Sequence, residues 1–512
     1  MSFEQFQSLN WSIMTPEFII LAVIAILVIM DLFMPKHMDR KILGWIGIAA
    51  ILAAMVSVFG MAGGHVESIL HDTFRLDSFA IAFKLLILGG GALVLFLATS
   101  YKATDGLERY TGEFYYLLLS ALLGAMVMTS SGDLITLYIG LELLSIPSYI
   151  LAGIQKDRLS SNESAMKYVI NGGISSAIAL FGMSYVYGLT GSTNLLEIAG
   201  QLSMLMDGQQ AYLLGLSFLM ILVGLSFKLA AAPYHMWAPD VYQGAPTPVT
   251  SFLSVVSKTA GFVIVVRILL TVFGSAATNG PGSIPILLDM QNYLAVIAAA
   301  TMIIGNVVAL RQSDIKRMFA YSSIAHAGYL LVAVTTLTSN MFYSIWFYLL
   351  AYLFMNMGAF AVIQVVSEKT GSTKITDFAG LYRRSPWLAV TMGILLISLA
   401  GFPGTAGFIG KLNIFVGAFA GQPHYVLASV MIATTVVSYF YYFGVMTQIF
   451  FRPAPAASEG EGEGKGSKFN MPFGIVVVLI VAVVGSVLFG IMPNIALDFM
   501  HNNLDIVQDF FS

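Results

Sequence analysis

The sequence contains no cysteine, and charged residues make up only 10% of its 512 residues. Without cysteine the chain can form no disulfide, no thiolate metal site and no cysteine-ligated iron–sulfur cluster. Its formal net charge of −3 gives no basic surface that would favour nucleic acid as a partner. We therefore expect this chain to bind no cofactor, metal or nucleic acid, and any redox centre to lie in other chains.

Hydrophobic residues make up 58% of the chain, and its mean hydropathy is +0.84. A water-soluble protein of this length does not have such a composition. Apolar runs of about 20 residues, the length that crosses a bilayer, begin near Pro16, Ile42, Ser78, Phe114, Leu134, Ala165, Ala211, Val249, Tyr293, Phe319, Met341, Trp387, Tyr425 and Pro472. The first run lacks the small-residue cleavage site of a signal peptide, so we interpret it as a retained helix. The sequence predicts an all-α polytopic membrane protein with about fourteen transmembrane helices.

Basic residues are unevenly divided between the loops that these helices define. With the N-terminus outside, the outer loops hold only Arg75. The inner loops hold Lys36, Arg40, Lys41, Lys102, Arg109, Lys156, Arg158, Arg311, Lys316, Arg317, Lys369, Lys374, Arg383, Arg384, Arg452, Lys465 and Lys468. Because basic loops stay on the cytoplasmic side of a membrane, this distribution predicts a multi-pass protein with both termini outside.

Two helical regions, 211–244 and 386–420, are too long for a simple crossing, since about 35 residues span roughly 50 Å. Both contain the pattern Leu-Ala-x-x-Pro, at 229–233 and 399–403. A proline inside a helix removes a backbone hydrogen bond and clashes with the preceding turn, so we predict that both helices are broken there. They would be the seventh and twelfth helices and would run in opposite directions, as in transporters built from inverted repeats.

The predicted helices and breaks divide the chain into five segments. We expect the first three transmembrane helices in 1–110, a five-helix repeat in 111–273 and a second, inverted repeat in 290–451. A stretch rich in Ala, Glu and Gly predicts a flexible inner loop at 452–469. The last helix and the tail would occupy 470–512.

A few basic residues lie well inside the predicted helices: Lys84, Lys228, Lys258, Arg267 and Lys411. A lysine at membrane depth costs roughly 2.5 to 3.5 kcal/mol, so it is kept where it pairs or lines a hydrated cavity. Lys228 and Lys411 lie near the two breaks, where freed backbone groups need water or polar side chains. Lys84 and Arg267 lie nearer to helix ends and could extend toward the interface, and the sequence does not assign them a role.

Glu142 is the acidic residue that the sequence places far inside a helix, about nine residues or 14 Å from Asp133 at its outer end. A Glu–Lys pair that forms and breaks could move protons, whereas a static pair would only join two helices. His326 could bridge protons between Lys258 and Lys411, or it could simply hydrogen-bond a neighbouring helix. The candidate relay residues are therefore Glu142, Lys228, Lys258 and Lys411, with His326 in addition.

Three stretches carry a resemblance to a known family: Leu141–Tyr149 (Leu-Glu-Leu-Leu-Ser-Ile-Pro-Ser-Tyr), Ser161–Tyr168 and Lys228–Gly261. They resemble the antiporter-like membrane subunits, in particular the subunit N family, of bacterial proton-pumping NADH:quinone oxidoreductase, respiratory complex I. The resemblance runs from about Asp133 to Lys411. It implies that Glu142, Lys228, Lys258 and Lys411 are the proton-channel residues of the fifth, seventh, eighth and twelfth helices.

The resemblance also implies a translocase subunit of the bacterial cell membrane that assembles with other membrane-arm subunits and contacts membrane lipid. NADH and quinone would be used by the whole complex and not bound by this chain. The alternative is a subunit of a multisubunit cation/proton antiporter without redox coupling, whose members share the broken helices but generally differ after the glutamate and between the two lysines. A solute carrier or inert scaffold is disfavoured, because no substrate-sized polar cluster accompanies the lysines.

Overall fold

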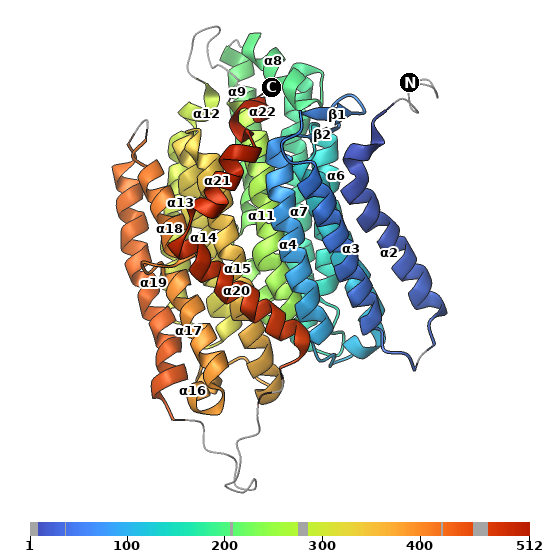
Figure 1. The fold of residues 1–512 in the computed structure, drawn as a ribbon. Helices are drawn as coiled ribbons and strands as arrows, with labels where there is room; N and C mark the ends of the chain where they lie inside the picture. Colours follow the sequence, from blue (N-terminus) through green and yellow to red (C-terminus); the bar gives the residue numbers. More distant parts are fainter. Residues whose placement is uncertain are drawn as a thin grey trace, which may run out of the picture.

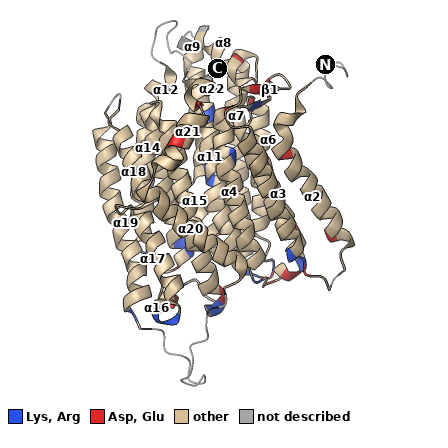
Figure 2. Ribbon diagram, in the orientation of Figure 1, with Lys and Arg blue, Asp and Glu red and all other residues tan. Residues whose placement is uncertain are grey.

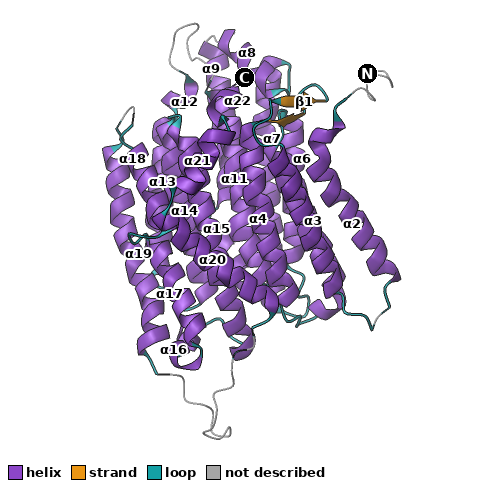
Figure 3. Cartoon of the chain, in the orientation of Figure 1, coloured by secondary structure: helices purple, strands orange, loops and turns teal. Residues whose placement is uncertain are grey.

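The computed structural model describes residues 9–35, 37–204, 208–274, 285–420, 423–453, 469 and 471–511. This part of the chain is a bundle of helices with one small pair of strands (Figures 1 and 3). Thirteen of the helices in these ranges are long and apolar enough to cross a membrane. The prediction of a polytopic helical membrane protein is therefore confirmed, whereas residues 454–468 of the predicted flexible loop lie outside the described residues.

The N-terminal part of the bundle contains the one pair of β-strands within the described ranges. Strands β1 and β2 form an antiparallel pair that the sequence analysis did not predict, because strands of three residues are too short to show a periodic pattern. The elements here are η1 (Trp11–Met14), α2 (Thr15–Phe33), α3 (Lys41–Gly60), β1 (Glu67–Ile69), β2 (Phe74–Leu76) and α4 (Ser78–Ser100).

The middle of the chain supplies most of the buried helices. The elements from residue 107 to residue 273 are η2 (Leu107–Tyr110), α5 (Thr111–Thr129), α6 (Leu134–Ala152), α7 (Leu159–Thr190), α8 (Leu195–Met204), α9 (Gly208–Leu229), α10 (Trp237–Gly244), α11 (Thr247–Ile268) and the π-helix η3 (Leu269–Phe273). The elements from residue 286 to residue 451 are α12 (Ile286–Asp289), α13 (Gln291–Ala309), α14 (Ile315–Thr336), α15 (Asn340–Thr370), η4 (Ile375–Phe378), α16 (Leu381–Arg384), α17 (Pro386–Ala400), α18 (Ala406–Gly417) and α19 (Tyr425–Phe451).

The C-terminal helix crosses the outside of the bundle. Helix α20 (Phe473–Ile491) packs against α4, α15, α17 and α18, and it is followed by α21 (Asn494–Asn503) and α22 (Ile506–Phe511). Figure 1 shows α20 running obliquely across the other helices, with α22 at the same end of the bundle as the start of α2.

Helix α11 forms the centre of the bundle, because every one of its side chains is buried, including that of Lys258. It packs against α4, α5, α6, α9, α14 and α15. Helices α2 and α19 lie at opposite edges (Figure 1). A polar side chain on α11 is therefore shielded from lipid by other helices of the same chain.

Both predicted breaks are present. Helix α9 ends at Leu229, and Ala230 then takes a left-handed conformation with φ of 56°. Helix α10 begins at Trp237, so seven residues separate the two helices. Helix α17 ends at Ala400, with Gly401 left-handed at φ of 83°. A left-handed residue after the last turn is a common helix stop. The predicted twelfth crossing is thus two shorter apolar helices, α17 and α18, and is not among the thirteen long ones.

Two hairpins, α5–α6 and α13–α14, repeat the same close contact between helices. A Cβ atom added to Gly124 would lie 2.3 Å from the backbone nitrogen of Leu144, and one added to Gly305 would lie 2.6 Å from that of Ala325. In both hairpins only the absence of a side chain at the glycine allows this approach. The two hairpins therefore pack in the same way although their sequences differ.

The second helix of each hairpin, α6 or α14, begins with equivalent backbone hydrogen bonds to a loop further along the chain. Leu134 N donates to Thr193 O at 2.9 Å, and Ile315 N donates to Thr373 O at 2.8 Å. The returning bonds run from Leu195 N to Gly132 O and from Ile375 N to Ser313 O, both at 2.9 Å. The two accepting threonines belong to the same short sequence, Thr-Gly-Ser-Thr, at 190–193 and 370–373.

Lys84 and Arg267, which could have extended toward the membrane interface, are instead held in buried ion pairs. Lys84 Nζ lies 2.6 Å from a carboxylate oxygen of Glu17, and both side chains are buried. Arg267 donates from both terminal nitrogens to Asp77, at 2.6 and 2.8 Å. The partner carboxylates come from α2 and from the start of α4, and the sequence alone does not show that they lie at the same depth.

Lys316, which the sequence analysis placed in an inner loop, is also buried. It lies in the first turn of α14 and donates to the carbonyl oxygen of Ala245 at 2.7 Å. Glu142 is half-buried, whereas Glu17, in the first turn of α2, is 3% exposed and is therefore the more deeply buried of the two carboxylates. Both differences arise from neighbouring helices that cover these positions.

Candidate proton path

Glu142 lies in the middle of α6, whose start is fixed by Asp133. The Asp133 carboxylate accepts hydrogen bonds from the backbone nitrogens of Ile135 (2.7 Å) and Thr136 (3.3 Å), which caps the helix. Glu142 is half-buried, and its Oε1 atom is buried without a hydrogen-bond partner in the described part of the chain. A carboxylate oxygen in this state is free to accept a partner, and burial without one is costly.

Lys228 lies in the last turn of α9, immediately before the first break. Its Nζ donates to the hydroxyl of Ser145 at 3.0 Å, and Ser145 is one turn beyond Glu142 on α6. The Glu142 carboxyl is near enough to act electrostatically on Lys228. In the described part of the chain, however, the two side chains form no ion pair. The predicted Glu142–Lys228 pair is therefore open in this structure, and its closing stays a prediction.

Helix α11 approaches Lys228 closely at Gly261. A Cβ atom added to Gly261 would lie 3.0 Å from Leu229 Cδ2 and 3.3 Å from Lys228 Cγ. Gly261 is three residues after Lys258, and residues with this spacing share a helix face. The absence of a side chain at Gly261 thus lets the end of α9 lie against the face of α11 that carries Lys258.

Lys258 is held by neutral oxygen atoms near the centre of the bundle. Its Nζ donates to both the carbonyl oxygen and the hydroxyl of Ser323 on α14. The Ser323 hydroxyl also shares a hydrogen bond of 3.2 Å with the hydroxyl of Tyr242, and the ring centroid of Tyr352 lies 5.8 Å from Nζ. Lys258 has no carboxylate partner among the described residues.

His326 lies one turn after Ser323 on α14 and is surrounded by tyrosines. Its Nδ1 is 2.6 Å from the hydroxyl of Tyr348 on α15, and its Nε2 is 3.1 Å from that of Tyr442 on α19. Both Lys258 and Lys411 act on it electrostatically. His326 is thus linked by hydroxyl groups to two other helices, and its action as a bridge between the lysines stays a prediction.

Lys411 on α18 folds back onto the end of α17. Its Nζ donates to the carbonyl oxygens of Leu399 and Ala400, both at 3.0 Å. These carbonyls belong to the last turn of α17, where a helix leaves its acceptors unpaired and carries partial negative charge. A Cβ atom on Gly401 would lie 2.8 Å from Lys411 Cδ, so the glycine makes room for the lysine.

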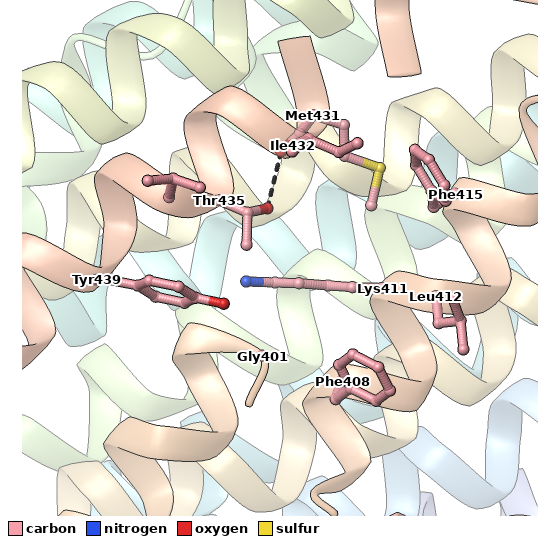
Figure 4. A pocket seen from close by; sticks show the side chains of 10 residues that line it. Gly401, Phe408, Lys411, Leu412, Phe415, Met431, Ile432, Thr435 and Tyr439 are labelled. Atoms are coloured by element: carbon pink, nitrogen blue, oxygen red, sulfur yellow. Dashed lines mark hydrogen bonds between the residues drawn. The ribbon is translucent and has the colours of Figure 1, made fainter. Parts of the chain in front are cut away.

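A cavity of about 210 Å³ lies beside Lys411. Figure 4 shows the lysine extended into it, with the ammonium end toward Thr435 and Tyr439 of α19. Most of the other lining residues are apolar: Phe408, Leu412, Phe415, Met431, Ile432 and Val436. The cavity gives this lysine a space that can hold water.

Some polar contacts near the path were not found from the sequence. The Asp240 carboxylate binds Lys167 Nζ and Arg317 Nη1, each at 2.5 Å, and so ties α10 to α7 and α14. Lys167 and Asp240 both lie in stretches that carry the family resemblance, and this could have marked them as candidate site residues. Because they are 73 residues apart in sequence, only the fold could show that they meet.

The described residues include no group of three or more His, Cys, Asp or Glu side chains that could hold a metal ion. The side chains that converge here are lysines, one glutamate, one histidine, and serine and tyrosine hydroxyls. Chemically, this set can bind, hold and pass protons.

Known proteins place the chain in a family. Residues 131–438, more than half of the chain, match the family described as NADH:quinone oxidoreductase/Mrp antiporter, TM. The chain is 58% identical over 501 residues to NADH-quinone oxidoreductase subunit N of Geobacillus sp. (strain WCH70), covering 98% of this chain and 100% of that protein. It is 50% identical over 516 residues to subunit N of Bacillus anthracis, covering 98% and 97%.

Solved structures also resemble this chain. A chain of respiratory complex I from Thermus thermophilus with bound aureothin is 30% identical, with a TM-score of 0.76, and the match covers 94% of this chain and 98% of that one. A chain of the Mrp complex from Dietzia sp. DQ12-45-1b has a TM-score of 0.79 at 18% identity, covering 98% and 100%, and so shares the fold. The chain belongs to the NADH-quinone oxidoreductase subunit N family, the antiporter-like membrane subunits of the proton-translocating respiratory complex I.

Proposed function

We propose that this subunit carries one proton path across the membrane, from the inner to the outer side, driven by quinone reduction in a neighbouring module. Lys258 is the central proton store, Lys228 is the switch that pairs with Glu142, and Lys411 is the terminal group of the second half-channel. His326 bridges Lys258 and Lys411.

One observation carries this proposal: the three lysines of the path are held by uncharged oxygen atoms. Lys228 binds a serine hydroxyl, Lys258 binds Ser323, and Lys411 binds two backbone carbonyls. Such a lysine can release its proton without leaving a buried carboxylate unpaired. In contrast, Lys84 and Arg267 bind carboxylates directly, and we assign these two a structural role.

We propose a topology of fourteen crossings, in which α17 and α18 together form the twelfth. Residues 111–273 and 290–451 are the two inverted five-helix repeats, after an N-terminal part at 1–110 and before the loop at 452–469 and the last helix and tail at 470–512. The matching α5–α6 and α13–α14 hairpins and the two Leu-Ala-x-x-Pro breaks support this division.

We place the subunit in the bacterial cell membrane with both termini outside. Figure 2 supports this orientation, because Lys and Arg gather at the end of the bundle near α16, opposite α8 and α22. Its partners are the other membrane-arm subunits and membrane lipid, and no nucleic acid. The whole complex uses NADH and quinone, and this chain binds no cofactor.

The test uses the complete complex, purified in mild detergent and reconstituted into sealed vesicles. Lys258→Ala and Glu142→Ala should each lower proton uptake coupled to quinone reduction while the complex still assembles, because apolar packing holds the helices. Thr259→Val is the matched control: Thr259 is buried next to Lys258, and its hydroxyl donates only within its own helix, to Val255 O at 2.9 Å. Full proton uptake by the Lys258 and Glu142 variants at normal abundance would overturn the proposal.

The same preparation distinguishes the alternative function. A mass-spectrometric inventory of the proteins that copurify with this subunit should contain quinone-reductase subunits. A cation/proton antiporter assembly in their place would support the antiporter without redox coupling, which the shared fold alone does not exclude.

A further inference from the structure

We propose that Ser145 is a positioning residue of the proton path: its hydroxyl is a second docking site for the Lys228 ammonium, which alternates between Ser145 and Glu142. This inference rests on the proposed function and adds to it a defined open state of the switch.

The hydrogen bonds of Ser145 fix it as an acceptor for Lys228. Its hydroxyl donates to the carbonyl oxygen of Leu141, one turn earlier on α6, at 2.6 Å. A hydroxyl has one proton and two lone pairs, so the oxygen can only accept the bond from Lys228 Nζ at 3.0 Å. Both side chains are buried, and the lysine is held there as a donor.

Glu142 offers the other docking position. It precedes Ser145 by three residues, so the two side chains share a face of α6 and their Cβ atoms are about 5 to 6 Å apart. The Oε1 atom of Glu142 is buried and unpartnered within the described residues. Lys228 has a flexible four-carbon side chain, and rotation about its bonds can carry the ammonium from one of these positions to the other.

The two positions differ in charge, and this difference makes a switch. On Glu142 the ammonium forms an ion pair, which holds both groups charged. On Ser145 it binds a neutral oxygen, and the Glu142 carboxylate is then free to take up a proton. The relative strength of the two contacts sets how often each state is populated.

A buried serine in a helix often forms a hydrogen bond only with a carbonyl oxygen of its own helix. Ser148 is such a residue. Ser148 lies three residues further along α6, is buried, and donates to Leu144 O at 2.6 Å. No lysine contacts it in the described part of the chain. It therefore matches Ser145 in residue type, helix and back-bond, and has no contact with Lys228.

The experiment compares Ser145→Ala, Ser145→Thr and Ser148→Ala in the complete complex in sealed vesicles. Ser145→Ala removes one hydrogen bond to a charged group and leaves Lys228 on Glu142, so the rate of proton uptake should fall about tenfold. Ser145→Thr keeps the hydroxyl and should retain uptake. Ser148→Ala should behave as the unchanged complex, and a loss equal to that of Ser145→Ala would overturn the inference.

Combining Ser145→Ala with Glu142→Gln separates this role from a structural one. If Ser145 acts by competing with the carboxylate, its removal has no further effect once Glu142 is neutral. An equal additional loss in both backgrounds would mean a structural role and would overturn the inference. Normal uptake by Glu142→Gln alone would refute the proposed function itself, whereas a defective Glu142→Gln beside a normal Ser145→Ala would refute only the role of Ser145.

Discussion

Lys84 and Glu17 form an ion pair of 2.6 Å between two side chains that are 0% and 3% exposed. Removal of one partner would leave an unpaired charge inside the protein. We expect Lys84→Met to destabilise the folded subunit by about 3 to 5 kcal/mol, whereas replacing both partners by neutral residues of similar size should cost far less. Unfolding in mixed detergent and the amount of assembled complex measure this difference.

The double variant Glu17→Gln/Lys84→Met is the control for that prediction. It should recover most of the stability, and proton uptake per assembled complex should stay normal, because this pair is outside the proposed path. A double variant that assembles well but no longer pumps would show that Lys84 carries protons.

Lys258→Arg tests whether the central lysine must lose its proton. Arginine keeps a positive charge that Ser323 can still bind, but a guanidinium hardly deprotonates at any working pH. We therefore expect proton uptake to fall as far as in the alanine variant, with normal assembly. An arginine variant that pumps at the normal rate would exclude proton release by this side chain.

His326→Phe tests the link between the two lysines. Phenylalanine keeps a ring of similar size but has no nitrogen to bond Tyr348 or Tyr442. If His326 bridges protons, uptake should fall while the amount of complex is unchanged. A histidine that only joins helices predicts another result, in which assembly and quinone reduction fall together and uptake per assembled complex is kept.

The sequence predicted the features that depend on local chemistry. The spanning helices follow from apolar length, and both breaks follow from a proline after Leu-Ala. It also placed Glu142, Lys228, Lys258 and Lys411 inside helices that the structure covers with neighbouring helices.

The sequence did not predict which side chains meet. The sequence places Lys84 and Arg267 near helix ends, but inside the bundle Lys84 binds Glu17 of α2 and Arg267 binds Asp77 at the start of α4. Ser145 lies in the same stretch as Glu142, and its contact with Lys228 joins residues 83 positions apart in the sequence. Such pairings depend on how helices are arranged, which no local pattern specifies.

Lys411→Met tests the end of the path. Methionine is apolar and of similar length, so a lysine with only a structural role at the membrane surface should tolerate it with little effect on transport. Lys411 is instead buried, bound to the last carbonyls of α17 and directed into a cavity. Methionine cannot carry a proton, and we therefore expect uptake coupled to quinone reduction to stop.

The Lys411→Met complex should still assemble, because water in the cavity of about 210 Å³ can bind the carbonyls of Leu399 and Ala400 that lose their donor. Leu412→Met is the matched control, since Leu412 is the next residue and lines the same cavity but carries no proton. Uptake and assembled complex are measured for both variants in the same vesicles. Normal uptake with normal assembly in Lys411→Met would mean that protons leave the subunit by another route.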